Sequence, residues 1–72
     1  MNKQEFLEEL KIAINKDDEL KENMVLNDLA EWDSLSKMCT ITLFADKLNI
    51  PITIEELKDF ETVDDLIKKA GF

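Results

Sequence analysis

The amino-acid sequence predicts an all-α fold, a small four-helix bundle with three main helices, one short helix and a long first connection. Three observations support this prediction. Apolar residues recur at helical spacing in separate segments, helix-capping residues stand between these segments, and no segment alternates in the manner of a strand. The 72 residues are expected to form a single domain, residues 1–72. A chain of this size buries only roughly 60% of the surface that its unfolded form exposes.

The first helix is predicted from Lys3 to about Asn15. Its apolar residues are separated by charged ones at a spacing that places them on one face, suited to a core. These apolar residues are Phe6, Leu7, Leu10, Ala13 and Ile14. Residues 15–18, Asn-Lys-Asp-Asp, favour turns and caps and therefore end the pattern.

A long connection from Glu19 to Trp32 follows, without glycine or proline. A connection of this length needs a function or local structure of its own, and a short turn of helix is expected near Leu26–Leu29. Trp32 is expected to cover the core beneath the connection, the alternative being an aromatic side chain that faces a partner. The apolar residues expected to point inward are Leu20, Met24, Val25, Leu26, Leu29 and Trp32.

The second helix is predicted to begin at Asp33 or Ser34, both favourable N-caps, and to continue to about Leu48. On a helical wheel its inward face, with Met38 at the edge, consists of Ile41, Phe44, Ala45 and Leu48. A second, outward stripe lies about a third of a circle away. That stripe consists of Leu35, Cys39, Thr42 and Asp46.

Two further helices complete the prediction. Pro51 closes the second helix because it forces the preceding residue toward an extended conformation. Thr53–Glu56 has the pattern of a capping box for a short third helix that ends near Asp59. A second cap signal, Thr62–Asp65, starts a fourth helix, and Gly71 is expected just past its end. The buried face of this last helix is predicted to be Val63, Leu66, Ile67 and Ala70.

The net charge of the protein restricts the classes of partner that it can bind. Nine basic and seventeen acidic residues give a net charge of −8, which disfavours binding to nucleic acid and to anionic membranes.

The single cysteine, Cys39, cannot form an internal disulfide, so no oxidising compartment is implied. No apolar run approaches the length of a membrane span or a signal peptide. We therefore expect a monomeric, cytoplasmic protein with protein partners.

The sequence lacks most of the residue types on which common catalytic sites depend. Without histidine there is no Ser–His or Cys–His pair, and a chain with one glycine has no glycine-rich phosphate loop. The pairs Asp17-Asp18 and Asp64-Asp65 do not fit a calcium loop and are interpreted as solvated charges at helix ends, so no metal site is expected. What remains is Ser34, a hydroxyl near the positive end of a helix dipole, where an attached phosphate would be stabilised. Ser36 is the rival hydroxyl but lacks a preceding aspartate.

Asp33-Ser34-Leu35 and its surroundings resemble the acyl carrier protein family, whose members carry a phosphopantetheine arm on the serine of an Asp-Ser-Leu motif. The resemblance covers nearly the whole chain. Upstream lies an apolar-x-Asp-Leu segment, and downstream lie an apolar-x-Ile-x-Ile stretch, a short acidic helix and a Thr-Val helix start. In this sequence those segments are residues 26–29, 48–52, 54–57 and 62–63.

This resemblance implies that the domain is not an enzyme. A phosphopantetheinyl transferase would attach a 4′-phosphopantetheine arm from coenzyme A to Ser34, with Asp33 and Leu35 beside the attachment point and Asp33 contacting the transferase or its metal. The arm would hold cargo as a thioester and present it to an acyl- or aminoacyl-activating ligase or an acyltransferase. The alternative is a small acidic helical adaptor that binds one partner protein and never takes a prosthetic group, in which Ser34 and Asp33 only cap the helix.

The sequence also departs from the family pattern. Ala30-Glu31-Trp32 stands where the family usually has a glycine, and the outward stripe of the second helix is nearly uncharged, whereas fatty-acid carriers are acidic there. A dedicated partner and an aminoacyl or short acyl cargo are therefore favoured, with fatty acyl and polyketide cargo left open. Met38 is either core filler or, as the resemblance implies, part of the wall of a pocket for an acyl chain. The expected partner-binding residues are Leu35, Lys37, Met38, Cys39, Thr42, Asp46 and Ile54.

Overall fold

A computed structural model describes all residues, 1–72, and shows an all-α protein of 27 × 25 × 18 Å. The four α-helices are α1 (Lys3–Ala13), α2 (Ser34–Leu43), α3 (Ile54–Asp59) and α4 (Val63–Ala70). A 3₁₀ turn, η1 (Leu26–Asp28), interrupts the long connection, and a π-helical turn, η2 (Phe44–Leu48), extends α2. The predicted all-α class and the four helices are therefore confirmed.

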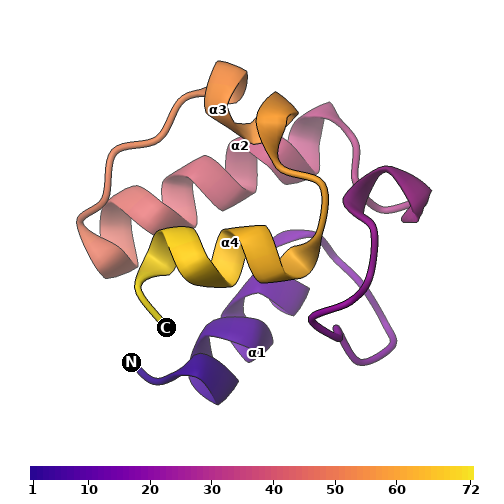
Figure 1. Cartoon of the computed structure of the whole chain (residues 1–72), viewed down its shortest axis with the longest axis horizontal. Coiled ribbons are helices and arrows are strands. Elements are labelled where there is room, and N and C mark those ends of the chain that lie inside the picture. The colour runs from indigo at the N-terminus through magenta and orange to yellow at the C-terminus, as the bar shows by residue number, and fades with distance from the viewer.

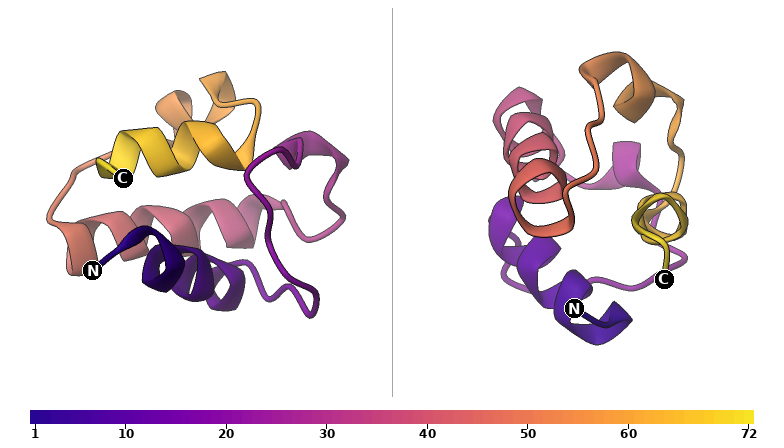
Figure 2. Two further views of the ribbon diagram at one scale, coloured as in Figure 1. Left: turned by 60° about the horizontal axis from the view of Figure 1, so that its bottom comes forward. Right: turned by 90° about the vertical axis from the view of Figure 1, so that its left-hand side faces the viewer.

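The helices surround a single core (Figures 1 and 2). Helices α1 and α2 lie side by side, as both views of Figure 2 show, and α4 faces them across the core. The short α3 sits at one end of the molecule beside α2, and the N- and C-termini lie near each other (Figure 1). The start of α2 therefore lies at the surface, next to the end of α1.

Helix α1 begins with a capping box and ends slightly earlier than predicted. The Asn2 side chain accepts a hydrogen bond from the Glu5 N–H, and the Glu5 carboxylate accepts one from the Asn2 N–H. At the other end Asn15 has a φ of +57°, a left-handed conformation that ends a helix. The helix therefore stops at Ala13, two residues before the predicted Asn15.

The core is built on aromatic contacts. The rings of Phe6 and Phe44 meet edge to face with their centroids 5.6 Å apart, and both side chains are fully buried. Trp32 is 8% exposed, so it covers the core as predicted rather than facing a partner. The other buried apolar residues are Leu10, Ile14, Leu20, Leu26, Leu43, Ile52, Leu57, Val63, Leu66 and Ile67.

The buried face of α2 differs from the prediction. Phe44 is buried, but Met38 and Ala45 are exposed, and Ile41 and Leu48 are only half-buried. The residues that α2 itself buries are Ser36, Thr40 and Leu43, and Phe44 is the buried residue of η2. Thr40 Oγ1 donates a hydrogen bond to the Ser36 carbonyl at 2.8 Å, so its hydroxyl is satisfied inside the core. A hydrophobicity count misses this face because two of its members are polar.

The long connection is tied to the start of α4 by backbone hydrogen bonds. The Leu26 N–H donates to the Glu61 carbonyl at 2.8 Å, and the Val63 N–H donates to the Met24 carbonyl at 3.0 Å. These bonds frame the bridge between Val25 and Thr62 and leave the Val25 side chain 41% exposed, contrary to its predicted inward orientation. The predicted helical turn near Leu26 is confirmed as η1.

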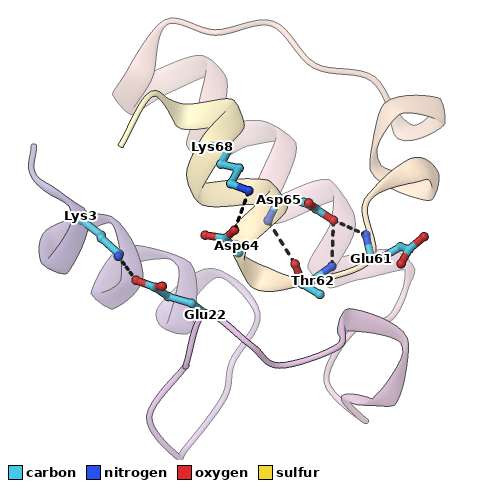
Figure 3. A network of polar contacts seen from close by, with 7 residues as sticks. All are labelled: Lys3, Glu22, Glu61, Thr62, Asp64, Asp65 and Lys68. Carbon is cyan, nitrogen blue, oxygen red and sulfur yellow. Dashed lines mark hydrogen bonds and ion pairs between the residues drawn. The ribbon is translucent and has the colours of Figure 1, made fainter.

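The two cap signals near the C-terminus have different outcomes. Before α4, Thr62 Oγ1 accepts from the Asp65 N–H, and the Asp65 carboxylate accepts from the N–H groups of Glu61 and Thr62 at 2.8 and 3.1 Å (Figure 3). Before α3, Thr53 caps the Glu56 N–H, but the Glu56 carboxylate pairs with Lys69 at 3.2 Å, so only half of the predicted capping box forms.

Helix α4 otherwise matches the prediction. Val63, Leu66 and Ile67 are buried and Ala70 is half-buried. Gly71 ends the helix with a φ of +92°, a conformation in which a side chain would be strained.

Candidate functional site

The start of α2 holds Ser34 as the first helical residue. Asp33 precedes it in an extended conformation, and the Asp33 carboxylate accepts a hydrogen bond from the Ser36 N–H at 2.8 Å. The Asp33 carbonyl accepts from the Lys37 N–H at 3.0 Å, which closes the first turn. Asp33 is therefore the N-cap, and it fixes the backbone on both sides of Ser34.

The hydrogen bonds at the start of α2 favour the charged form of the Asp33 carboxyl. The hydrogen bond from the Ser36 N–H is the main cause that lowers the pKa of Asp33 below its ordinary value of 3.8, with the Ser36 hydroxyl as a second cause. The site therefore carries a fixed negative charge beside the exposed Ser34 hydroxyl at neutral pH.

The two serine hydroxyls of this turn lie in opposite environments. Ser34 is exposed, whereas Ser36 is 6% exposed. Ser36 Oγ donates a hydrogen bond to the Glu31 carbonyl and has the Ile14 carbonyl 3.5 Å away. Only the Ser34 hydroxyl is thus available to a reagent in solution.

Backbone N–H groups without a backbone acceptor accompany the Ser34 hydroxyl. The Ser36 N–H is taken by the Asp33 carboxylate and the Lys37 N–H by the Asp33 carbonyl. The Ser34 and Leu35 N–H groups make no backbone hydrogen bond, as expected in the first turn of a helix. A phosphate ester on Ser34 fits these two donors and the positive end of the helix dipole.

The predicted partner-binding residues do not form one surface. Leu35 and Met38 are 72% and 55% exposed, Thr42 and Asp46 are exposed, and Lys37, Cys39 and Ile54 are half-buried. Met38, Cys39, Thr42 and Asp46 line one open hollow between α1 and α2. Leu35 and Cys39 line a neighbouring hollow, whereas Lys37 and Ile54 line neither.

The structure adds Ile12 to this surface. Ile12 lies near the end of α1, is 73% exposed and lines the same hollow as Met38. Sequence reasoning did not select it, although a signal was present. Ile12 falls outside the apolar face formed by Phe6, Leu10 and Ile14, so it is a large apolar residue with no place in the core.

No three histidine, cysteine, aspartate or glutamate side chains come together in an arrangement suited to a metal ion. None of the helices combines the length and apolar character required to cross a bilayer. Comparison of the chain with models of protein families, with characterised proteins and with solved structures gives no match.

Proposed function

We propose that this protein is an acyl-carrier-like domain that carries acyl or aminoacyl cargo as a thioester on a 4′-phosphopantetheine arm attached to Ser34. The observation that supports this most directly is the difference between the two serines of the first turn of α2. Ser34 is exposed beside a charged aspartate and the first N–H groups of α2, whereas Ser36 is buried and already bonded. The sequence frame around Asp33-Ser34-Leu35 is the second support.

The attachment reaction would use coenzyme A and a phosphopantetheinyl transferase. Ser34 Oγ would form a bond to the phosphorus that bears pantetheine, and the bond from that phosphorus to the bridging oxygen of the diphosphate would break. Adenosine 3′,5′-bisphosphate leaves, and the hydroxyl proton passes to a base of the transferase. The Ser34 and Leu35 N–H groups would bind oxygens of the resulting phosphodiester.

The domain itself would supply position rather than catalysis. Asp33 holds the first turn in one conformation, and its negative charge can attract the transferase or a metal ion bound to it. An arm tethered at one point raises the local concentration of cargo at a docked ligase or acyltransferase. This role needs an exposed hydroxyl on a rigid helix start, which Ser34 provides.

A second candidate function is an adaptor without a prosthetic group. The exposed apolar side chains Ile12, Leu35 and Met38 favour it, since such a cluster marks an interaction surface. The two candidate functions differ at one atom, Ser34 Oγ, which carries the phosphopantetheine arm in a carrier and stays unmodified in an adaptor.

The test is incubation with coenzyme A and a broad-specificity phosphopantetheinyl transferase, followed by intact mass measurement. A carrier gains the mass of one phosphopantetheinyl group, and Ser34→Ala abolishes the gain while its helical circular dichroism stays unchanged. A known carrier treated in parallel shows that the transferase is active. Absence of the adduct, or an adduct that persists in Ser34→Ala, contradicts the proposal.

A further inference from the structure

Lys16 is the most enclosed of the lysines that form ion pairs. Its side chain is 9% exposed, whereas the side chains of the four other paired lysines are between 36% and 74% exposed. The Lys16 ammonium lies 3.8 Å from the Glu31 carboxylate, which is its only ion-pair partner. A lysine with so little exposure has lost most of its hydration, so its charge depends on that carboxylate.

The backbone of Glu31 is bonded to the turn that presents Ser34. The Glu31 carbonyl accepts a hydrogen bond from the Ser36 hydroxyl and another from the Asp33 N–H at 3.0 Å. One residue, Glu31, therefore connects the Lys16 ammonium to the residues on both sides of Ser34.

The chain that carries Lys16 is itself fixed at the end of α1. The Lys16 N–H donates to the Lys11 carbonyl at 3.0 Å, and Asn15 makes the left-handed turn that ends the helix. The Ser36 hydroxyl also lies 3.5 Å from the Ile14 carbonyl, which is a second contact between the same two segments. The ion pair therefore ties the end of α1 to the start of α2.

This ion pair differs in kind from those on the surface. Lys58–Glu55 and Lys68–Asp64 each join two residues of one helix, and their lysines stand in water, which screens the attraction. Lys16–Glu31 joins two segments far apart in the chain and is shielded from water on the lysine side. Its loss is expected to change how these segments meet.

Resting on the proposed function, we propose that Lys16 is a positioning residue for the modification of Ser34 and acts through Glu31. With the ion pair in place, the Glu31 carbonyl stays within reach of the Ser36 hydroxyl and the Asp33 N–H, and Ser34 is presented in one conformation. Without it, the Glu31 side chain moves into solvent, and the presenting conformation makes up a smaller fraction of the folded molecules. The apparent affinity of the transferase falls in proportion to that fraction.

The first test is the kinetics of phosphopantetheine transfer from coenzyme A to Ser34. Lys16→Met keeps the length of the side chain, removes its charge and leaves only the half-exposed Glu31 unpaired, so the variant should fold. Its KM as a substrate of the transferase should rise about three- to tenfold. The kcat should change by less than about twofold, because Lys16 acts on the population of the turn and not on the reacting atoms.

Two further comparisons identify the ion pair as the cause. Glu31→Gln should raise the KM as well, and the double variant Lys16→Met/Glu31→Gln should exceed neither single variant, because one interaction is lost only once. Lys3→Met is the matched control. It removes the same charge and breaks the ion pair of Lys3 with Glu22, which lies at the opposite end of α1 and is exposed, so its KM should stay unchanged.

Trp32 gives a readout that does not involve the transferase. It is the sole tryptophan, follows Glu31 directly and is 8% exposed. In the absence of denaturant, with the helical circular dichroism unchanged, acrylamide should quench the fluorescence of Lys16→Met and Glu31→Gln faster than that of the original protein. Lys3→Met should be quenched at the original rate.

The outcomes separate this proposal from the carrier function. If the original protein is modified at Ser34, an unchanged KM in Lys16→Met overturns the positioning role and leaves the carrier function standing, whatever the quenching shows. An equal rise in KM for Lys3→Met, or additive effects of Lys16→Met and Glu31→Gln, also overturns it, since either result assigns the effect to separate charges. Absence of any adduct on the original protein overturns the carrier function and the positioning role with it.

Discussion

The Asp33 carboxylate accepts a hydrogen bond from the Ser36 N–H at 2.8 Å and thereby closes the turn that presents Ser34 between them. The same Ser36 turns its hydroxyl inward to the Glu31 carbonyl. The backbone on each side of Ser34 is thus held by a side chain, while the Ser34 hydroxyl is left exposed. This division of roles among three neighbouring residues leads to separate predictions for each of them.

Replacement of Asp33 should separate its capping role from its charge. Asp33→Asn keeps an oxygen that can accept from the Ser36 N–H, so the urea midpoint of unfolding should stay close to that of the original protein. Asp33→Ala loses the acceptor and should unfold at a lower urea concentration. Both variants lose the negative charge, and both should be modified more slowly by the transferase if that charge contacts the transferase. Equal urea midpoints for Ala and Asn would contradict the capping role.

The two serines should respond oppositely to alanine. Ser36→Ala leaves the Glu31 carbonyl without its buried donor and should lower the free energy of unfolding by about 1–3 kcal/mol. Ser34→Ala removes an exposed hydroxyl and should change that free energy by less than about 0.5 kcal/mol. Urea denaturation followed by circular dichroism measures both. A larger loss in Ser34→Ala than in Ser36→Ala would refute the assignment of which hydroxyl supports the fold.

Helix caps and helix existence were predictable from sequence because they depend on residues close together in the chain. The Thr62 cap and the left-handed Gly71 illustrate this. The incomplete capping box at Thr53 was not predictable from local sequence. The Glu56 carboxylate forms an ion pair with Lys69 of α4 and makes no hydrogen bond to the Thr53 N–H.

The site was predictable at Ser34 and not at the hollow between α1 and α2. The Asp-Ser-Leu turn is local, so its residues identify it. That hollow depends on how α1 lies against α2, and no local pattern in α2 predicts that Met38 and Ile12 line the same hollow. The burial of Ser36 and Thr40 was missed for another reason: both residues are polar, and their hydroxyls are satisfied by nearby backbone carbonyls, those of Glu31 and Ser36.

Acid should destabilise the protein through its capping carboxylates. The pKa values of Asp33 and Asp65 lie below the ordinary 3.8 because each carboxylate accepts backbone N–H bonds. The two carboxyls therefore bind protons more readily in the unfolded chain than in the folded protein. The stabilisation that their charged forms give to the folded state is fully present above the unfolded pKa. It is lost as the pH falls through the folded pKa. The urea midpoint should decline below about pH 4.

Two variants assign this acid sensitivity to the caps. Asp33→Asn and Asp65→Asn should each show a smaller decline in urea midpoint between pH 5 and about pH 3, because an amide does not titrate there. Asp28→Asn, at an exposed residue that caps no α-helix, serves as the matched control. A decline unchanged in both cap variants would show that other carboxylates cause the acid sensitivity.

Leu35 should matter for partner recognition and not for folding. Its side chain is 72% exposed directly after Ser34, so Leu35→Ala should leave the free energy of unfolding nearly unchanged. A partner that docks on this turn would bury the leucine, and truncation of a well-buried interface side chain costs about 1 kcal/mol or more. The kcat/KM of the phosphopantetheinyl transferase should therefore fall about fivefold, mainly through a higher KM.

Cys39→Ser, a small change at a half-buried position of the same stripe, should have a weaker effect in the same direction. Unchanged kcat/KM values for both variants would show that the transferase docks elsewhere on the protein, because both residues lie on the stripe of α2 that begins directly after Ser34.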